Sequence, residues 1–442
     1  MQDAEHLRGV IKDCVHCGFC LPACPTYQLW AEEMDSPRGR IYLVNQILDG
    51  AELTPAAAEH FDRCLGCMAC MTACPSGVQY DQLIEAARVW TEEARPVLAA
   101  SPDTPDGKRS VRDRAARAAI FSLFPYPRRL RAMTGPLRAA QRTGLNRRLA
   151  RSSLPGRLSP VLGAALRLAP QELAPPAAAR RLPERVQARG PRRAVVGMLT
   201  GCVQSVFFPQ VNAATARVLA LEGCDVVIPR GQGCCGALSL HSGREAEAMT
   251  FAQRTIATFE QAAVDVIVVN SAGCGSAMKE YERLLSGSDW AGRAAAMSGK
   301  VRDLSEFLAE VGPVAQRHPL PATAAYHDAC HLGHAQRITR QPRELLRAIP
   351  ELNVVELADA GTCCGSAGVY NLLQPEAAGE LGARKAQAVM DAGAPLLISA
   401  NPGCSLQIAA ALADRGEQVT VAHVAEILDA SLRGLPPPAG PA

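Results

Sequence analysis

Long apolar runs are missing from this chain, and aromatic residues are scarce. Phe, Trp and Tyr make up only 4% of its 442 residues. Two stretches of twenty or more residues lack charge, 194–216 and 394–413, but polar residues, Pro209 and Asn401-Pro402-Gly403 interrupt them, so neither is expected to cross a membrane. The first fifteen residues carry charges throughout and offer no apolar signal region. We therefore expect a cytoplasmic protein without structural disulfides.

The formal charge of +3 conceals a basic segment. Residues 107–193 hold 21 Lys or Arg against three acidic residues, a local charge of +18 that leaves −15 for the remainder. Its prolines allow short helices at most, so we expect a linker between two domains. A basic segment suggests nucleic-acid binding, but its aromatics are limited to Phe121, Phe124 and Tyr126, too few for base stacking, so we expect no nucleic acid.

We instead expect residues 120–124 and the surrounding arginines to dock on anionic lipid or on an acidic partner. This would place the protein peripherally on the cytoplasmic face of the inner membrane. A solvated linker is the alternative.

Cysteine is abundant, and eight of the 17 cysteines form two runs spaced C-x2-C-x2-C-x3-C-P that begin fifty residues apart. Such runs are typical of bacterial two-cluster ferredoxins, in which each [4Fe-4S] cluster takes three thiolates from one run and the fourth from the other. Structural zinc would need two pairs rather than two quartets. We expect these cysteines to bind iron in two sets: Cys14, Cys17, Cys20 and Cys74 for cluster 1, and Cys64, Cys67, Cys70 and Cys24 for cluster 2.

Short apolar runs alternate with helical patterns beyond the linker, which predicts α/β units with parallel sheets. The cysteines reveal a duplication. Cys202 precedes a Cys-Cys-Gly tripeptide by 32 positions, and Cys330 precedes a second by 33; a further cysteine follows 39 or 40 positions later. Open α/β sheets bind ligands where their strands end, which is where these cysteines fall. The candidates for further iron–sulfur clusters are Cys202, Cys234, Cys235, Cys274, Cys330, Cys363, Cys364 and Cys404.

Other interpretations of these eight cysteines stay open. They could be buried core residues or a redox dithiol, although the glycine after each Cys-Cys pair suggests close backbone approach to a bound group. The remaining Cys224 is expected to be a buried small hydrophobe. Three histidines near Cys330, namely His327, His331 and His334, are expected to form hydrogen bonds rather than bind metal.

Beyond these motifs, the chain resembles the iron–sulfur subunits of flavin-linked 2-hydroxyacid and glycerol-3-phosphate dehydrogenases and heterodisulfide reductase-related proteins. The resemblance is strongest to the glycolate oxidase iron–sulfur subunit family. It rests on the blocks CVHCGFC, CPTYQL, PRGRIYL, CPSGV, NAATARVL, SAGCG and CCGSAG. One departure is that each repeat ends in a single Cys, because Ser271 and Asn401 stand where the related reductases have another.

The resemblance implies an α+β multidomain protein. Its parts would be an N-terminal two-cluster ferredoxin-like domain (1–106), a basic helical linker (107–193) and two CCG repeats (194–320 and 321–442). The implied function is electron transfer from FAD-containing subunits that oxidise glycolate to glyoxylate, toward a quinone or other acceptor. No residue of this chain would be catalytic, consistent with the absence of a convincing flavin motif or acid–base constellation. The alternatives are a heterodisulfide reductase-like or glycerol-3-phosphate dehydrogenase subunit.

Overall fold

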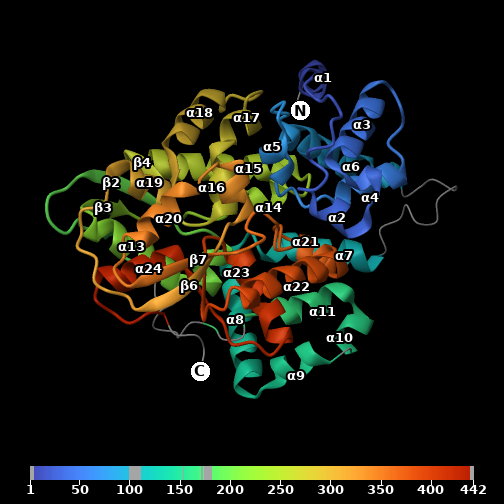
Figure 1. The fold of residues 1–442 in the computed structure, drawn as a ribbon. Coiled ribbons are helices and arrows are strands. Elements are labelled where there is room, and N and C mark those ends of the chain that lie inside the picture. The colour runs from blue at the N-terminus through green and yellow to red at the C-terminus, as the bar shows by residue number, and fades with distance from the viewer. Residues whose placement is uncertain (1–3, 99–110, 153, 171–172, 174–181, 439–442) are drawn as a thin grey trace.

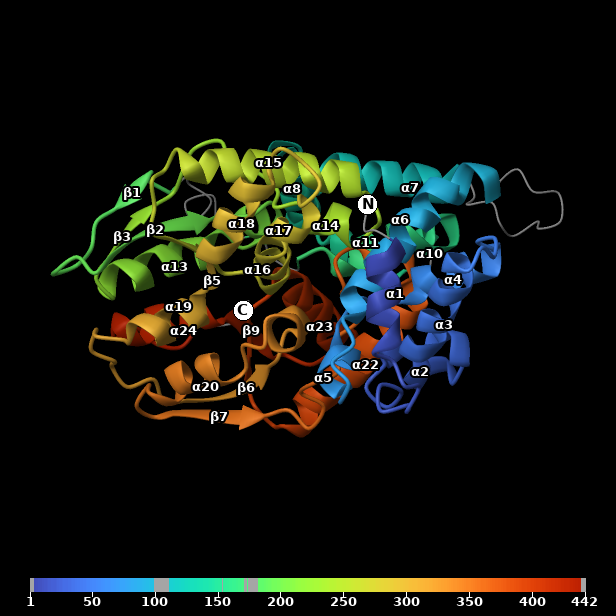
Figure 2. The ribbon, with the colours of Figure 1, turned by 90° about the horizontal axis from the view of Figure 1, so that it is seen from above.

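The computed structural model describes residues 4–98, 111–152, 154–170, 173 and 182–438. It consists of a helical N-terminal domain, a helical linker and two α/β repeats (Figure 1). Seen from above, the N-terminal helices cover one end of the paired repeats (Figure 2). This arrangement confirms the predicted fold class.

Short helices build the N-terminal domain around the two cysteine runs. Proline opens three of them, and the caps Ser36 and Thr54 each accept a hydrogen bond from the first helical turn. Leu7, Phe61 and Leu83 are fully buried in its core. The helices are α1 (Ala4–Lys12), α2 (Pro25–Trp30), α3 (Pro37–Leu48), α4 (Pro55–Arg63), α5 (Ala69–Ala73) and α6 (Tyr80–Leu98), with a 3-10 turn at Glu33–Asp35.

The linker contains α7 (Val111–Leu123), α8 (Pro127–Arg142), α9 (Leu145–Arg151), α10 (Leu154–Leu158) and α11 (Pro160–Leu168). Helix α8 runs for 16 residues through Pro136, so the expectation of short helices was too strict. The expected docking segment 120–124 was also wrong in part. Ile120 and Phe121 are buried against Val369 and Leu372 of the second repeat, because the chain covers its own apolar side chains first.

Each repeat has a sheet with the same strand order. The first sheet runs β1-β3-β2-β4-β5, with only β1 antiparallel, and the second runs β7-β6-β8-β9, all parallel. Removing β1 leaves identical orders, which confirms the duplication. The strands are β1 (Arg185–Val186), β2 (Ala194–Leu199), β3 (Cys224–Val227), β4 (Val266–Val269), β5 (Val301–Asp303), β6 (Ala322–His327), β7 (Leu352–Glu356), β8 (Leu396–Ser399) and β9 (Thr420–His423).

Helices flank both sheets. In the first repeat they are α12 (Val203–Phe207), α13 (Pro209–Leu221), α14 (Ala237–Leu240), α15 (Glu245–Glu260), α16 (Ala272–Lys279), α17 (Tyr281–Leu284), α18 (Ala291–Lys300) and α19 (Leu304–Val311). In the second they are a π-helix (His331–Ala335), α20 (Arg340–Arg347), α21 (Tyr370–Leu373), α22 (Pro375–Asp391), α23 (Pro402–Asp414) and α24 (Val424–Leu432). None of the described helices is long and apolar enough to span a bilayer.

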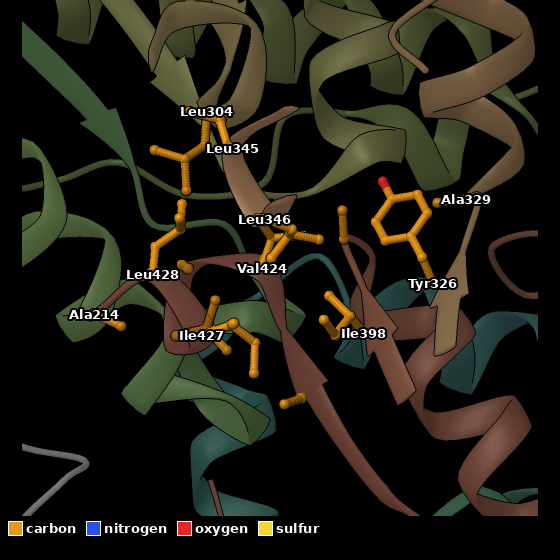
Figure 3. Packing of buried hydrophobic residues seen from close by; sticks show 14 of the residues in the cluster. Ala214, Leu304, Tyr326, Ala329, Leu345, Leu346, Ile398, Val424, Ile427 and Leu428 are labelled. Atoms are coloured by element: carbon orange, nitrogen blue, oxygen red, sulfur yellow. The ribbon is translucent and has the colours of Figure 1, made fainter. Parts of the chain in front are cut away.

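The two repeats share one hydrophobic core. Ala214 and Leu304 of the first repeat belong to the same buried cluster as Ile398 and Leu428 of the second (Figure 3). Helix α13 packs on α24, where Arg217 forms a 2.6 Å ion pair with Asp429. Cys224 lies fully buried in this core, as expected. The joint core brings the strand ends of both sheets to one place.

Candidate iron–sulfur sites

Each predicted ferredoxin quartet surrounds its own small cavity. A cavity of about 30 Å³ is lined by Cys14, Cys17, Cys20, Cys74 and also Cys70. A second of about 20 Å³ is lined by Cys24, Cys64, Cys67 and Cys70. In both cases the cysteine before proline crosses over to the other run's cavity. Cys70 lines both, so the two cavities adjoin.

Matching backbone conformations wrap the two runs around these cavities. The residue two positions after the first cysteine is left-handed in both, with φ of 52° at His16 and 64° at Gly66. The residue after the second cysteine is left-handed too, with φ of 85° at Gly18 and 62° at Met68. Left-handed residues at such short spacing curl successive N–H groups toward one centre, which suits an anionic sulfide-containing group.

Burial disfavours ionisation of three of the ferredoxin thiols in the absence of a metal. It raises the pKa of Cys67 and Cys70 well above the usual thiol value, and that of Cys20 to about 11. Cys64 differs, because the charges of Arg40 and Arg88 outweigh burial and lower its pKa. A metal cluster would displace the thiol protons and supply the missing positive charge. The donor set therefore fits iron–sulfur clusters.

The eight cysteines of the repeats converge on one cavity of about 240 Å³. It is lined by Cys202, Cys234, Cys235, Cys274, Cys330, Cys363, Cys364 and Cys404. These cysteines follow β2, β3, β4, β6, β7 and β8 at the carboxyl edges of the sheets. Leu137 of α8, Ala165 of α11 and Leu65 from the ferredoxin run close the cavity on other sides. Sequence spacing predicted two separate sets, and the shared core places them face to face.

Within the cavity, each repeat keeps its own thiol quartet. The Sγ atoms of Cys202 and Cys234 lie 3.7 Å apart, and those of Cys330 and Cys363 lie 4.0 Å apart. Hydrogen bonds from Cys234 and Cys274 lower the pKa of Cys235 well below its usual value. In the second repeat, Cys363 and Cys404 lower the pKa of Cys364 in the same way. Four convergent thiols per repeat fit an iron–sulfur cluster.

The glycine of each Cys-Cys-Gly tripeptide is required by a helix rather than by a bound group. Gly236 and Gly365 have φ of 89° and 87°. A Cβ atom at these positions would lie 3.0 Å from the carbonyl oxygen of Ala248 and 2.7 Å from that of Ala378. The backbone at each glycine does approach another group closely, as expected. That group is the backbone of helix α15 or α22 and not a bound ligand.

The two residues that replace cysteine in the repeats meet across the cavity. Ser271 donates a hydrogen bond to Asn401 Oδ1 at 3.4 Å, and the amide of Asn401 donates to Cys404 Sγ at 3.4 Å. Asn401 thus orients a thiol instead of supplying one. Both residues line the cavity.

Histidines connect the second repeat to the ferredoxin domain. His331 Nε2 lies 2.8 Å from the carbonyl oxygen of Gly66, within the cluster 2 run. His334 bonds Thr72 Oγ1 at 2.9 Å and the carbonyl of Gly361 at 2.8 Å. Hydrogen bonding was predicted for both. The partners Gly66 and Thr72 both belong to the second cysteine run, so the second repeat lies directly beside this run.

Sequence reasoning missed His241 and Glu85. The ring of His241 packs edge-on against that of His331, with 4.8 Å between the ring centroids. Its Nδ1 lies 3.6 Å from Oε1 of Glu85 in α6. Burial opposes ionisation of Glu85, but Arg283 and His241 lower its pKa to about 2. No short sequence motif contains these interacting residues, because Glu85 lies in the N-terminal domain, His241 in the first repeat and His331 in the second. Only the position of His241, six residues after Cys235, could have drawn attention to it.

Two interlocking ferredoxin quartets beside a cysteine-lined α/β pair define an iron–sulfur electron-transfer protein. Comparison with protein families agrees. A 4Fe-4S dicluster domain matches residues 10–78, and a cysteine-rich domain matches 196–279 and 324–409. A model of the linker region of the glycolate oxidase iron-sulfur subunit matches residues 112–169.

Full-length relatives narrow the class to one family. The probable glycolate oxidase iron-sulfur subunit of Bacillus subtilis is 35% identical over 95% of this chain and 94% of its own length. The glycolate oxidase iron-sulfur subunit of Escherichia coli is 32% identical over 98% of this chain and 97% of its own length. Lactate utilization protein A of Exiguobacterium is 32% identical over 54% of this chain and 98% of its own. The chain belongs to the family of glycolate oxidase iron-sulfur subunits and carries [4Fe-4S] clusters.

Proposed function

We propose that this chain relays electrons within a flavin-dependent glycolate dehydrogenase complex. FAD-containing subunits oxidise glycolate to glyoxylate and release two electrons, which pass singly through this chain toward a quinone. Cys14, Cys17, Cys20 and Cys74 hold cluster 1, and Cys64, Cys67, Cys70 and Cys24 hold cluster 2. The two quartets of the repeats hold a further cluster each. The domains are 1–106, 107–193, 194–320 and 321–442.

The observation that carries the relay is the contact between cluster 2 and the repeats. Leu65 and Cys67 belong to one buried cluster with Cys363, and Cys330 packs against it. The cavities of clusters 1 and 2 share Cys70. All proposed sites therefore form a continuous series, with the second repeat next after cluster 2.

The surface around cluster 1 suits the electron donor. Val15 and Phe19, within the first run, are 69% and 64% exposed, and Cys17 is exposed as well. Apolar side chains so open to solvent beside a redox group mark an interaction site. We assign this surface to the flavoprotein subunits.

Metal analysis with EPR spectroscopy on the anaerobically purified full chain tests the relay. About sixteen irons per chain are expected if both repeats hold a four-iron cluster, whereas about eight would mean that the repeats are empty. Substituting Cys235→Ser should remove about four irons and leave the ferredoxin signals intact. A Cys224→Ser control lies outside every site and should retain full iron content.

Co-purification with the flavoprotein subunits tests the donor surface. Phe19→Ser should weaken assembly while iron content stays unchanged, because this side chain is exposed. Trp30→Ser is a control, since Trp30 is 40% exposed but lies outside the cluster 1 cavity. Glycolate oxidation by the isolated chain would contradict this division of labour.

The linker is the part of the chain that we propose contacts the membrane surface. Leu154, Leu158 and Leu162 are 63%, 65% and 45% exposed. Exposed arginines on the linker, Arg128, Arg131, Arg148 and Arg157 among them, suit anionic headgroups on the cytoplasmic face of the inner membrane. Liposome flotation should depend on anionic lipid and weaken in Leu158→Ser. Flotation indifferent to lipid charge would contradict the proposal.

A second candidate function is reduction of a disulfide substrate in the cysteine-lined cavity. The size of this cavity and its eight thiols favour the alternative. Two-electron reduction of a disulfide to two thiols by the purified chain, with dithionite as the electron source, would support it if the activity were lost in Cys235→Ser.

A further inference from the structure

One histidine of the second repeat lacks hydrogen bonds. His327 ends β6 and is 1% exposed. Neither of its ring nitrogens makes a conventional hydrogen bond, and the ring instead interacts with the thiol of Cys364, whose pKa it helps to lower. A buried imidazole normally pairs both nitrogens, since an unpaired one costs the lost interaction with water. His423, also buried, has both ring nitrogens bonded. Apart from this interaction with Cys364, the lone pair of the neutral imidazole is therefore available to a bound metal.

His327 lies against two thiols of the proposed cluster site. One ring nitrogen and the Sγ atoms of Cys364 and Cys404 all lie within 4.8 Å of one another. All three residues are buried. A nitrogen and two sulfurs at this spacing form a donor set that iron and zinc both accept.

The first repeat has no counterpart of this histidine. Leu199 ends β2 three positions before Cys202, as His327 ends β6 three positions before Cys330. Leu199 packs in an apolar cluster with Cys235 and Cys274, the equivalents of the two thiols beside His327. The partner residue on the neighbouring strand is also apolar in the first repeat and polar in the second. Leu199 of β2 pairs with Val269 of β4, whereas His327 of β6 pairs with Ser399 of β8. The two sites are thus chemically different.

We infer that His327 ligates one iron of the second repeat's cluster, beside the irons held by Cys364 and Cys404, whereas the first repeat's cluster has thiolate ligands alone. This rests on the proposed presence of clusters in both repeats. His327 then replaces one of the four thiolates of the second quartet as a ligand. A neutral imidazole in place of a thiolate makes the cluster site less negative, and histidine ligation raises the reduction potential of iron–sulfur centres. Because of this higher reduction potential, the cluster of the second repeat is the favoured acceptor for an electron that leaves cluster 2.

Pulsed EPR on the reduced, full-length protein tests the ligand. Protein grown with 15N-histidine should show a nitrogen coupling of iron-bound imidazole. His327→Leu, which copies the first repeat, should lose it. His327→Cys should keep the iron content without the coupling and shift the potential of one cluster downward. The control His331→Asn removes the other imidazole beside Cys330 and should leave the coupling in place.

Three results would overturn the assignment in distinguishable ways. About sixteen irons per chain without any histidine coupling would exclude ligation by His327 and leave the proposed relay standing. Coupling that survives in His327→Leu and vanishes in His331→Asn would exclude His327 and name another ligand. About eight irons per chain would show that the repeats lack clusters, and the relay would fail with the inference.

Discussion

Arg40 joins three segments of the ferredoxin domain around the second cysteine run. Its side chain is 1% exposed and donates to the carbonyl of His60 at 2.7 Å, to Thr26 at 3.1 Å and to the buried Asp35 at 3.2 Å. Its charge also helps to lower the pKa of Cys64. One guanidinium thus holds the segments around cluster 2 together and favours the thiolate form.

Replacing Arg40 with Met should destabilise the protein strongly. Asp35 would keep a buried negative charge without its most deeply buried partner, at a cost of about 3–5 kcal/mol in the free energy of unfolding. Cluster 2 should also become harder to reduce, because a nearby positive charge is lost. Denaturant unfolding and potentiometric titration measure the two effects.

Arg63→Met provides the matched control. Arg63 pairs with the same Asp35 at 3.0 Å, but its side chain is 31% exposed. The loss should therefore stay within about 1 kcal/mol. Equal losses in the two variants would contradict the importance of burial.

At the scale of elements, the linker helix α7 packs against both repeats. Phe121 of α7 is 3% exposed, clusters with Leu372, and lies beneath the Arg244 guanidinium at 4.5 Å from its ring centroid. It therefore touches both repeats at once. A segment expected to connect two domains and to dock on lipid or on a partner thus also packs against both repeats.

Truncating Phe121 to Ala should cost about 3–5 kcal/mol of local stability by leaving a cavity between α7 and the repeats. Faster proteolysis or hydrogen exchange within the linker would report it. Leu158→Ser should change neither, because Leu158 is 65% exposed. Unchanged exchange in Phe121→Ala would show that this contact does not hold the linker.

Considering the molecule as a whole, His423 joins the two repeats. It ends β9 of the second repeat, its Nε2–H donates to the carbonyl of Asn270 in the first at 2.8 Å, and its Nδ1 accepts from Ala425 N–H at 3.0 Å. Burial lowers the pKa of His423 to about 4. The neutral ring is thus the form that holds the repeats together.

The stability of the whole protein should therefore fall in acid. Between pH 6.5 and 4 the unfolded chain binds a proton at this histidine that the folded chain does not, so stability is complete above 6.5 and declines by about 3 kcal/mol toward pH 4. His423→Asn retains an acceptor for the α24 cap without titrating, so its urea midpoint should depend less on pH. Identical pH profiles would contradict this role.

Both ferredoxin quartets and the duplication could be predicted because they depend on local spacing. The prolines after Cys24 and Cys74 and the repeated Cys-Cys-Gly tripeptides fix the backbone within a few residues. The exposure of residues 120–124 could not be predicted. A basic, apolar helix has the same pattern whether it faces lipid or its own chain, and only packing selects between them.

The sequence by itself determined which cysteines are candidate iron ligands and that one α/β unit occurs twice, since spacing and periodicity act over short range. Only the tertiary structure decided that both repeats open into one cavity, that cluster 2 adjoins the second repeat, and that His327 differs from Leu199. Those contacts join residues hundreds of positions apart, such as Gly66 and His331. Burial of the joint core holds them together, and its free energy depends on how the elements assemble.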